Sequence, residues 1–480
     1  MSNIYSDLQT YFGYKSFRGK QEEIIQRVLE KKHTIVIMPT GMGKSLCYQI
    51  PALSFSGLTV VISPLIALMQ DQVQSLRKKG IEATFINSSL NKEERNKRYK
   101  ELEEKKYKLL YVTPERFRKE KFLESISKRQ IDLLAVDEAH CISQWGHDFR
   151  PDYTRIGEIR CLLGNPPVIA LTATATPEVQ KDMVHYLKLN SNEVKIYHQG
   201  IDRTNLHLRI QEVHDDRQKV EYLLSLFQNK THGNSVVYFS LIKHLKYIST
   251  VLHQKKIPHM VYHGGLETDK RKSIQNQFMN GENNIVLATN AFGMGVDKDN
   301  IRYVIHMEIP QSIESYYQEI GRAGRDGKQS ECILLYNEED LNIQLEFIKW
   351  QNPSEEYFIR AYDFISANLE KVNAYGTDYV RENLSFKNKN DYRLETVLRL
   401  FDRYHVTKGN IDTKNLVIVD DIPELLINEN RLEEKKQQEL KKLLHMVQYT
   451  KSEMCGMIYI HNYFGLQLDE PCGRCAYCNY

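Results

Sequence analysis

Residues 38–45 have the composition and spacing of a phosphate-binding loop. In such a loop, glycines let backbone N–H groups wrap phosphate oxygens, a lysine reaches the terminal phosphates and the next hydroxyl holds Mg²⁺. An apolar β-branched run precedes the segment and a helical pattern follows it, as this chemistry requires. Met38 stands where the generic pattern has glycine, so a glycine-rich turn without a ligand is the alternative. The candidate residues are Thr40, Gly41, Met42, Gly43, Lys44 and Ser45.

Two adjacent acids, Asp137 and Glu138, follow the apolar run 133–136, which predicts a buried strand. Open α/β sheets bind ligands at the carboxyl ends of their strands, and both acids would lie there. Asp137 suits Mg²⁺ coordination, and Glu138 suits polarising an attacking water. His140 is either a packed core histidine or a group that couples these acids to other motifs, and its position beside them favours coupling.

Arg322 and Arg325 are three residues apart, the spacing of adjacent turns on one helix face. They could be a surface pair held by salt bridges. Arginine also stabilises the charge on a transferring phosphoryl group, and a site between two domains can recruit it on closure. We therefore predict a catalytic role for both arginines and favour Arg325 as the dominant one.

Four of the eight cysteines cluster near the end of the sequence, at positions separated by 17, 3 and 3 residues. Four thiolates can complete a tetrahedral zinc site, which would fold a tail that has no other core. The C-x-x-C-x-x-C run alone is also compatible with an iron–sulfur or redox element. The clustered residues are Cys455, Cys472, Cys475 and Cys478, whereas Cys47, Cys141, Cys161 and Cys332 are scattered.

Short β-branched runs, each followed by a helical pattern, would position these groups, and the sequence contains two series of them. The alternation predicts two tandem α/β units, each with a parallel sheet, which meet near residues 200–209. The first series comprises 34–38, 59–63, 108–112, 131–136 and 168–171. The second comprises 235–239, 259–262, 284–289, 302–306 and 331–336, with helical patterns at 241–255 and 267–280.

The sequence changes in character after residue 340. Helical patterns at 356–368 and 392–404 precede a strand pattern at 415–419, which suggests a small winged-helix-like unit. The highly charged run 429–442 is typical of a solvated helix face or a connector.

The composition is that of an ordinary globular protein of 480 residues, 41% of them hydrophobic and 26% charged. It excludes disordered, collagenous and low-complexity chains. The net charge of +3 does not indicate a polyanionic partner, so any basic surface must be local. We find no transmembrane run or secretory signal, and we expect no membrane association and a location in a bacterial-type cytoplasm.

The phosphate loop, the Asp-Glu-Ala-His box and the two arginines together resemble a superfamily 2 helicase, and more closely the RecQ family of DNA helicases. The likeness covers residues 7–345 strongly and 450–478 clearly. It implies an α/β fold of two tandem RecA-like domains, at 1–205 and 206–345, followed by a small α-rich C-terminal region. It also implies ATP, Mg²⁺ held by Ser45 and Asp137, and structural Zn²⁺ on the four cysteines.

The resemblance adds residues that contact adenine and DNA phosphates. In residues 12–21 it implies adenine recognition by Tyr14, Arg18 and Gln21, where the residues alone indicate an N-terminal cap on the sheet. Segments 63–65 and 113–116 resemble motifs that grip the phosphates of a single strand, and ordinary strand-to-helix turns are the alternative. The corresponding residues are Ser63, Pro64 and Thr113.

Residues 143–151 resemble the aromatic-rich loop of the RecQ family. Its rings can stack on bases while its arginine meets phosphate, and a buried core loop is the alternative. Residues 172–174 resemble the motif that links nucleotide state to domain closure, and 288–297 resemble one that touches both ATP and DNA. The residues implied are Trp145, His147, Phe149 and Arg150 in the loop, and Thr289, Gly295 and Asp297 in the last motif.

The order of modules departs from the usual family arrangement, in which zinc module and winged helix follow the core in turn. Here about a hundred residues lie between the core and Cys455, and the sequence stops two residues after Cys478. We therefore expect a winged-helix-like module at 346–445, a zinc module at 446–480 and no accessory HRDC domain.

The resemblance implies ATP- and Mg²⁺-dependent unwinding of duplex DNA, with 3′ to 5′ movement on one strand, in DNA repair and recombination. The expected partners are single-stranded DNA, forked or tailed duplexes and a single-stranded-DNA-binding protein. An ATP-gated clamp or strand-annealing factor without processive unwinding is the alternative. It is favoured because the family's winged helix with a strand-separating hairpin, which usually follows the zinc module, is not expected here. RNA is a less favoured substrate, because the aromatic loop and the cysteines resemble the DNA family.

Overall fold

The computed structural model describes residues 3–39, 41–143, 146, 149–228, 233–293, 298–384 and 391–478. They form two compact units, which are described separately. The first unit comprises residues 1–308, 314–335 and 452–480, and the second comprises 309–313 and 336–451. In the described parts of the chain, no helix has the length and apolar character needed to cross a membrane.

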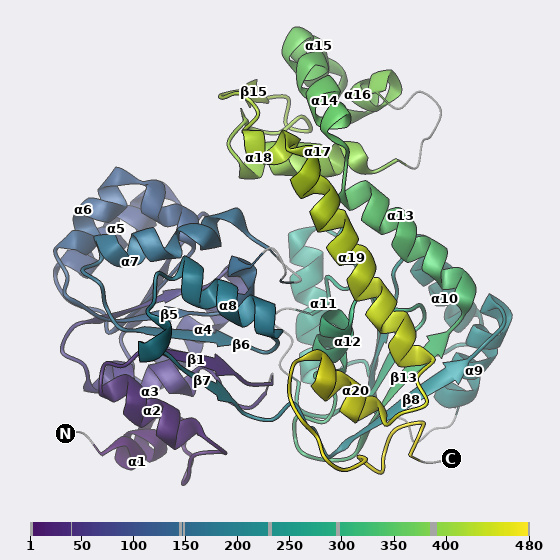
Figure 1. Ribbon diagram of the computed structural model, residues 1–480, viewed down its shortest axis with the longest axis horizontal. Helices are drawn as coiled ribbons and strands as arrows, with labels where there is room; N and C mark the ends of the chain where they lie inside the picture. The colour runs from purple at the N-terminus through teal and green to yellow at the C-terminus, as the bar shows by residue number, and fades with distance from the viewer. Residues whose placement is uncertain are drawn as a thin grey trace. The chain divides into compact units, whose positions relative to one another are not determined.

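The first sheet has seven strands in the order β3-β4-β2-β5-β6-β1-β7, and all neighbours are parallel. Alternate residues of β1 lie in two separate cores, because Ile35 and Ile37 face one side and Val36 and Met38 face the other. Helices α5 to α8 complete the first core and α2 to α4 the second (Figure 1). Burial on both faces explains the unbroken apolar runs in the sequence.

The strands of this sheet are β1 Thr34–Ile37, β2 Leu58–Ile62, β3 Ala83–Ile86, β4 Leu109–Val112, β5 Ile131–Val136, β6 Val168–Thr172 and β7 Lys195–His198. The α-helices are α1 Ile4–Asp7, α2 Gln21–Leu29, α3 Leu46–Ser54, α4 Ile66–Lys78, α5 Lys92–Glu103, α6 Glu120–Ser127, α7 Ile156–Leu162 and α8 Pro177–Tyr186. A π-helical turn spans Leu8–Phe12, and 3₁₀ turns span Pro114–Arg118, Ala139–Ile142, Pro151–Arg155 and Ser191–Glu193.

The second sheet has six strands in the order β10-β11-β9-β12-β13-β8, and β9 to β13 pair in parallel. Val237, Leu287, Ile305 and Ile333 of four strands share one core with the helix α10. The predicted pair of tandem parallel-sheet α/β regions is therefore confirmed. The strands are β8 Leu206–Glu212, β9 Asn234–Tyr238, β10 Met260–Tyr262, β11 Ile285–Ala288, β12 Ile301–His306 and β13 Ser330–Tyr336; the helices are α9 Asp216–Gln228, α10 Ile242–Gln254, α11 Thr268–Asn280 and α12 Ile313–Ile320.

In the two large sheets the sequence patterns miss three of the described strands, β3, β7 and β8, and each lies at an edge of its sheet. An edge strand has only one neighbour and is less completely covered than a central one. In β7 only Tyr197 is buried, and the outer half of β8 is half-buried or exposed. β7 and β8 therefore lack the continuous apolar run that marks the central strands.

The second unit is mainly helical and has its own core, to which α14, α16 and α17 contribute Phe358, Val380 and Phe401. The predicted order of helix, helix and strand is present as α14, α17 and β15, with two further helices between the first two. The elements are α13 Leu341–Gln351, preceded by a 3₁₀ turn Glu338–Asp340, α14 Glu355–Ala367, α15 Leu369–Tyr375, α16 Thr377–Leu384, α17 Arg393–Arg403, β14 Thr407–Lys408, β15 Val417–Ile418, α18 Glu424–Ile427 and α19 Glu429–Thr450.

The charged run 429–442 forms most of the 22-residue helix α19. None of these residues is buried, in line with the predicted solvated helix face or connector, and one side of the helix contacts α13. Lys435 Nζ donates to the carbonyl of Gln351 at 3.1 Å, and Glu439 accepts a hydrogen bond from Asn352, both at the end of α13. Partial desolvation lowers the pKa of Lys435. The charges on this side therefore join two helices.

Residues 452–478 belong to the first unit and contain the helix α20 Gly456–Tyr463. Leu208 of β8 and Cys475 form a parallel bridge, and the backbone N–H of Leu208 donates to the carbonyl of Arg474 at 3.1 Å. The tail is thus joined to the edge strand of the second sheet.

Candidate functional site

The loop after β1 is built to expose backbone N–H groups. Gly41 and Gly43 have φ of +81° and +78°, a conformation that glycine adopts without strain. A Cβ on Gly43 would lie 2.7 Å from Nε2 of Gln21, so a larger residue would clash there. The loop leads directly into α3, whose N-terminus favours bound anions. Thr40, a predicted loop residue, lies outside the described residues.

Lys44 carries the strongest sign of a missing anion. Its Nζ is buried and has no hydrogen-bond partner in the described part of the chain. A buried ammonium without a partner is costly unless a ligand supplies one. The phosphates of a nucleotide would provide acceptors at this point, so the residues present fit the group that the loop motif predicts.

Gln21 holds the loop from the side. Its Nε2 donates to the carbonyls of Met42 and Gly43 at 2.8 and 3.2 Å, and its Oε1 accepts from the backbone N–H of Arg18 at 2.8 Å. The Tyr14 ring is 48% exposed, and the Arg18 guanidinium lies 5.9 Å from its centroid. The structure thus gives Gln21 a loop-positioning role and leaves Tyr14 accessible for stacking.

The two acids follow β5 directly. Asp137 still pairs with the sheet, because its N–H donates to the carbonyl of Ile62 at 2.8 Å. Glu138 has φ of 47°, an uncommon left-handed conformation for a non-glycine residue, and such strain is concentrated at functional sites. Burial, followed by the charge of Glu138, raises the pKa of Asp137 to about 7, and Lys44 opposes the shift. A bound cation would reverse this rise.

His140 connects the acids to the segment 172–174. Its Nδ1 lies 2.8 Å from Oγ1 of Thr172 and 3.4 Å from Oε2 of Glu138. The Thr172 hydroxyl in turn donates to the carbonyl of Thr174 at 3.0 Å. His140 is buried, so it is packed in the core and also bridges two predicted motifs.

The two predicted arginines follow α12 and have different surroundings. Arg322 donates a hydrogen bond to the carbonyl of Gly293 in the second α/β region. The stem of Arg325 lies against the phosphate loop, since a Cβ on Gly41 would be 3.1 Å from its Cγ and Cδ. Within this unit, the geometry therefore brings Arg325 to the loop.

The candidate DNA-contacting residues follow the carboxyl ends of β2, β4 and β11. Ser63 is buried, and its Oγ has no hydrogen-bond partner among the residues that the structure describes. Arg150 Nη1 donates to the carbonyl of Pro64 at 3.0 Å and so joins the aromatic-rich segment to this turn. Thr113 begins the turn after β4, and the N–H of Thr289 donates to the carbonyl of Tyr262 at 3.1 Å.

Several predicted residues fall outside the described parts of the chain. In the aromatic-rich loop these are Trp145 and His147, while Phe149 and Arg150 are described and half-buried. In the segment after β11 they are Gly295 and Asp297.

A buried polar group behind the acids is absent from the sequence prediction. The hydroxyls of Tyr48 in α3 and Tyr111 in β4 lie 3.4 Å apart, and burial raises the pKa of both. Gln49 Nε2 donates to Tyr111 at 3.3 Å and to Oε1 of Gln72 in α4 at 2.9 Å. The network links the helix after the phosphate loop to the elements that carry Ser63 and Thr113. A tyrosine inside an apolar run is the only sequence signal for it.

The four clustered cysteines form a metal-binding set. Their sulfur atoms all lie within 4.8 Å of one another. The N–H groups of Cys472 and Gly456 donate to the sulfurs of Cys455 and Cys475 at 3.2 and 3.3 Å. Burial raises the pKa of Cys472 to about 12, whereas backbone N–H groups outweigh burial at Cys455 and lower its pKa to about 7. Four thiolates this close need a cation, and an all-sulfur tetrahedral set suits Zn²⁺.

Comparison with known families divides the chain into three matches. Residues 18–183 match the DEAD/DEAH box helicase family, 218–327 match the helicase conserved C-terminal domain, and 419–479 match the RecQ zinc-binding family. The last match contains all four cysteines, in agreement with Zn²⁺ as their metal.

Similar proteins cover most of the sequence. The ATP-dependent DNA helicase RecQ of Bacillus subtilis is 39% identical over 473 residues, which are 98% of this chain and 66% of that protein. The probable ATP-dependent DNA helicase RecS of B. subtilis is 42% identical, over 74% of this chain and 71% of that protein. The RecQ of Pasteurella multocida is 44% identical, over 69% of this chain and 52% of that protein. The chain thus spans about half to two thirds of the length of these RecQ proteins.

Solved structures share the fold at low sequence identity. The DUF1998 helicase MrfA bound to DNA and AMPPNP has a TM-score of 0.60 and 19% identity, over 72% of this chain and 52% of that one. Dbp5 of S. cerevisiae bound to RNA and ADP BeF₃ has a TM-score of 0.56 and 16% identity, over 72% of this chain and 90% of that one.

Proposed function

This chain belongs to the RecQ family of superfamily 2 helicases, and on that premise we propose that it is an ATP-dependent DNA helicase. It would use ATP and Mg²⁺ to move 3′ to 5′ along single-stranded DNA and to separate duplexes during repair and recombination. The observation that carries the proposal is the Lys44 ammonium, which is buried near Asp137, has no hydrogen-bond partner among the described residues and lies in a loop that Arg325 contacts.

The chemistry of hydrolysis divides among a few side chains. Ser45 and Asp137 would hold Mg²⁺, which neutralises phosphate charge when bound. Glu138 orients the attacking water, and His140 keeps the acid in register with Thr172 through contacts of 3.4 and 2.8 Å. Lys44 and Arg325 supply positive charge to the transferring phosphoryl group from two regions of the chain.

DNA binding would rest on phosphate contacts and stacking. Ser63, Thr113 and Thr289 offer hydroxyls at the ends of parallel strands, and Phe149 with Trp145 offers rings. Such contacts carry no base code, so binding should tolerate any sequence and weaken steeply with salt. The bond from Arg150 to Pro64 supports coupling between the aromatic loop and the phosphate-gripping turn.

Strand separation is a second step beyond movement, and the second unit bears on it. Its hairpin consists of two strands of only two residues each, β14 and β15. In that hairpin Val417 is 48% exposed and so could act as an apolar wedge. A chain whose hairpin does not wedge would act as an ATP-gated clamp or annealing factor, the competing function.

The deciding experiment is unwinding of a short duplex that carries either a 3′ or a 5′ single-stranded tail, with ATP and Mg²⁺. Lys44→Ala is the blank, and Lys32→Ala is the matched control, because Lys32 lies before β1 and is exposed. Opening of the 3′-tailed substrate supports the proposal. DNA-stimulated ATP hydrolysis without opening of either substrate favours the clamp, and wild type without DNA-stimulated hydrolysis contradicts both.

A further inference from the structure

The turn that carries the two arginines is held by a side chain from the linker before β8. We call this turn, residues 321–330, the finger turn, because it carries the two arginines predicted to reach the phosphoryl group. Arg203 Nη2 donates to the carbonyls of Ala323 and Gly324 at 2.9 and 2.8 Å, and Nη1 donates to that of Gly321 at 3.4 Å. One guanidinium thus contacts the backbone on both sides of Arg322.

The acceptors of Arg203 are neutral. Among the described residues it forms no ion pair, and its remaining bond is to Oδ1 of Asn205 at 3.4 Å. A guanidinium presents its donors in a planar fork at fixed angles, which a lysine ammonium does not reproduce. Burial also lowers the pKa of this arginine. Burying a charged guanidinium without an ion-pair partner is unfavourable. Its presence here therefore indicates that the turn requires a precise backbone geometry.

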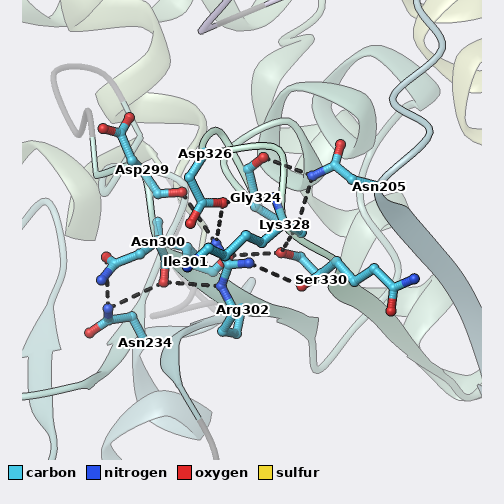
Figure 2. Close-up of polar contacts among 12 residues, drawn as sticks. Asn205, Asn234, Asp299, Asn300, Ile301, Arg302, Gly324, Asp326, Lys328 and Ser330 are labelled. Atoms are coloured by element: carbon cyan, nitrogen blue, oxygen red, sulfur yellow. Dashed lines mark hydrogen bonds and ion pairs between the residues drawn. The ribbon is translucent and has the colours of Figure 1, made fainter.

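Asn205, two residues further along the linker, fixes the same turn (Figure 2). Its Nδ2 donates to the carbonyls of Gly324 and Lys328 at 2.7 and 2.8 Å, and its own carbonyl accepts from the N–H of Ser330 at 2.9 Å. A Cβ on Gly324, which has φ of +55°, would lie 2.3 Å from that Nδ2. The side chain therefore fills the space that the glycine leaves.

Arg302 of β12 holds the far end of the turn, and Figure 2 shows its contacts radiating from the guanidinium. It donates to Oδ1 of Asp326 at 2.6 Å and to the carbonyl of Gln329 at 3.0 Å. The N–H of Asp326 donates to the carbonyl of Asp299 at 3.2 Å. With both ends tied, the direction in which Arg325 leaves the turn depends on these anchors.

The linker is anchored in turn by the cysteine module. Asp202 forms an ion pair with Arg474, which lies between Cys472 and Cys475, and Arg474 Nη1 also donates to the carbonyl of Cys472 at 2.9 Å. Beside this pair, the carbonyl of Ile201 accepts from the Tyr317 hydroxyl of α12 at 2.7 Å. Asp202 and Arg203 are adjacent in the linker. The cysteine module contacts the first of them, and the finger turn contacts the second.

We propose that Arg203 is a positioning residue for the finger turn, and that the zinc module holds it there through Arg474 and Asp202. This inference rests on the proposed ATP hydrolysis by the chain. Arg203 touches no nucleotide, and it acts by fixing the backbone from which Arg325 projects.

The first test compares Arg203→Ala and Arg203→Lys with Arg209→Ala in the full chain. Arg209 of β8 is a suitable control because its side chain is largely exposed and forms an ion pair of 3.5 Å with Glu331 of β13. We expect both Arg203 variants to lower kcat about 100-fold, as a misplaced catalytic group does, with nucleotide affinity within about twofold of wild type. The control should retain wild-type turnover.

A double-mutant cycle separates positioning from general damage. In an Arg325→Ala background, Arg203→Ala should lower kcat by less than about twofold, because the group that it positions is gone. A full 100-fold loss in that background would overturn the proposal.

Hydrogen exchange of the 318–330 segment gives a readout that needs no activity. Arg203→Ala should speed exchange of the amides in the finger turn about tenfold or more and leave β9 and β11 unchanged. An unchanged turn would overturn the inference even if the chain hydrolyses ATP. A wild-type chain without ATP hydrolysis would instead contradict the proposed function, so the two failures are distinguishable.

The zinc branch is tested by Arg474→Ala and by the reversed pair Asp202→Arg with Arg474→Asp. Arg474→Ala should keep one zinc per chain, lower kcat about two- to fivefold and speed exchange in the finger turn, as loss of a partly exposed ion pair does. The reversed pair should restore part of the lost kcat and part of the protection of the finger turn against exchange. Wild-type turnover and exchange in Arg474→Ala with zinc retained would overturn this branch.

Discussion

The two α/β regions share one architecture but treat their polar groups in opposite ways. Along the carboxyl edge of the first sheet, Lys44 Nζ and Ser63 Oγ are buried without partners in the described residues. In the second region, Arg203, Asn205 and Arg302 donate hydrogen bonds to carbonyls of the finger turn. These two groups of the first region would be satisfied by a ligand, whereas the backbone of the finger turn is held by donors from the protein itself. Binding and preorganisation are thus divided between the two halves.

The outer edges of the two sheets differ as well. The first sheet ends in β3 and β7, while β8 at the edge of the second carries the bridge to Cys475. The second region therefore has the tail that carries the four cysteines along one of its borders.

Removal of the metal should have the largest effect of these changes, and we expect that effect in the tail that borders the second region. Replacing Cys472 and Cys475 with serine should reduce zinc from one per chain to none, since structural zinc contributes about 10–16 kcal/mol of binding free energy. We expect protease cleavage within 452–478, measured together with metal analysis. Cys161→Ser, at an exposed lone cysteine, is the control. Wild-type chain without zinc would remove the basis of this prediction.

Lys44→Ala tests the unsatisfied half. Removing the buried ammonium should lower ATP turnover more than about 10³-fold while the fold is retained, because phosphoryl transfer relies on such fixed charge. Steady-state hydrolysis and thermal unfolding should be measured side by side with Lys32→Ala. Unchanged turnover would refute the phosphate assignment.

Arg325→Ala tests the preorganised half and ranks the two arginines. Turnover should fall about 10³-fold with nucleotide affinity preserved, as for other arginine fingers. Arg322→Ala should lower turnover less than Arg325→Ala does, because Arg322 already donates to the carbonyl of Gly293 in its own region. A larger loss for Arg322 would reverse the ranking, and single-turnover kinetics would show which step is affected.

The smallest effect concerns the pH dependence of the first region. Without nucleotide and Mg²⁺, the pKa of Asp137 is raised to about 7 by burial and by Glu138. Between its ordinary pKa near 4 and this value, only the unfolded chain releases the proton, so stability falls as pH rises and then levels above pH 7. The Asp137→Asn variant lacks this titration. From pH 5 to pH 8 its free energy of unfolding should therefore rise by about 2–3 kcal/mol relative to that of the wild type. Denaturant unfolding at both pH values measures it, and a pH-independent difference would contradict the raised pKa.

Sequence patterns predict most central strands because burial on both faces demands continuous apolar runs. They also predict Lys44, Asp137 and Arg325, since each lies in a short motif whose spacing has a chemical reason. The edge strands β7 and β8 are missed because half-exposed residues break the run.

The anchors of the finger turn could not be predicted for a different reason. Arg203 and Gly324 are 121 residues apart, and Arg474 and Asp202 are 272 apart. No local pattern distinguishes such an arginine from one on the surface, because its partners are backbone carbonyls brought near by the fold. The roles of Gln21 and Tyr48 depend on tertiary contacts in the same way.

The pairing of α13 with α19 has a consequence for how this kind of chain diversifies. Gln351 and Lys435 touch although 84 residues separate them, so the helical segment between them starts and finishes at neighbouring points. The entropy of closing a chain grows only slowly with its length, and segments with adjoining ends are the ones that tolerate exchange. Residues 353–428 could therefore be shortened, enlarged or exchanged for another segment while α13 and α19 keep their contact and the connectivity of the rest of the unit stays the same.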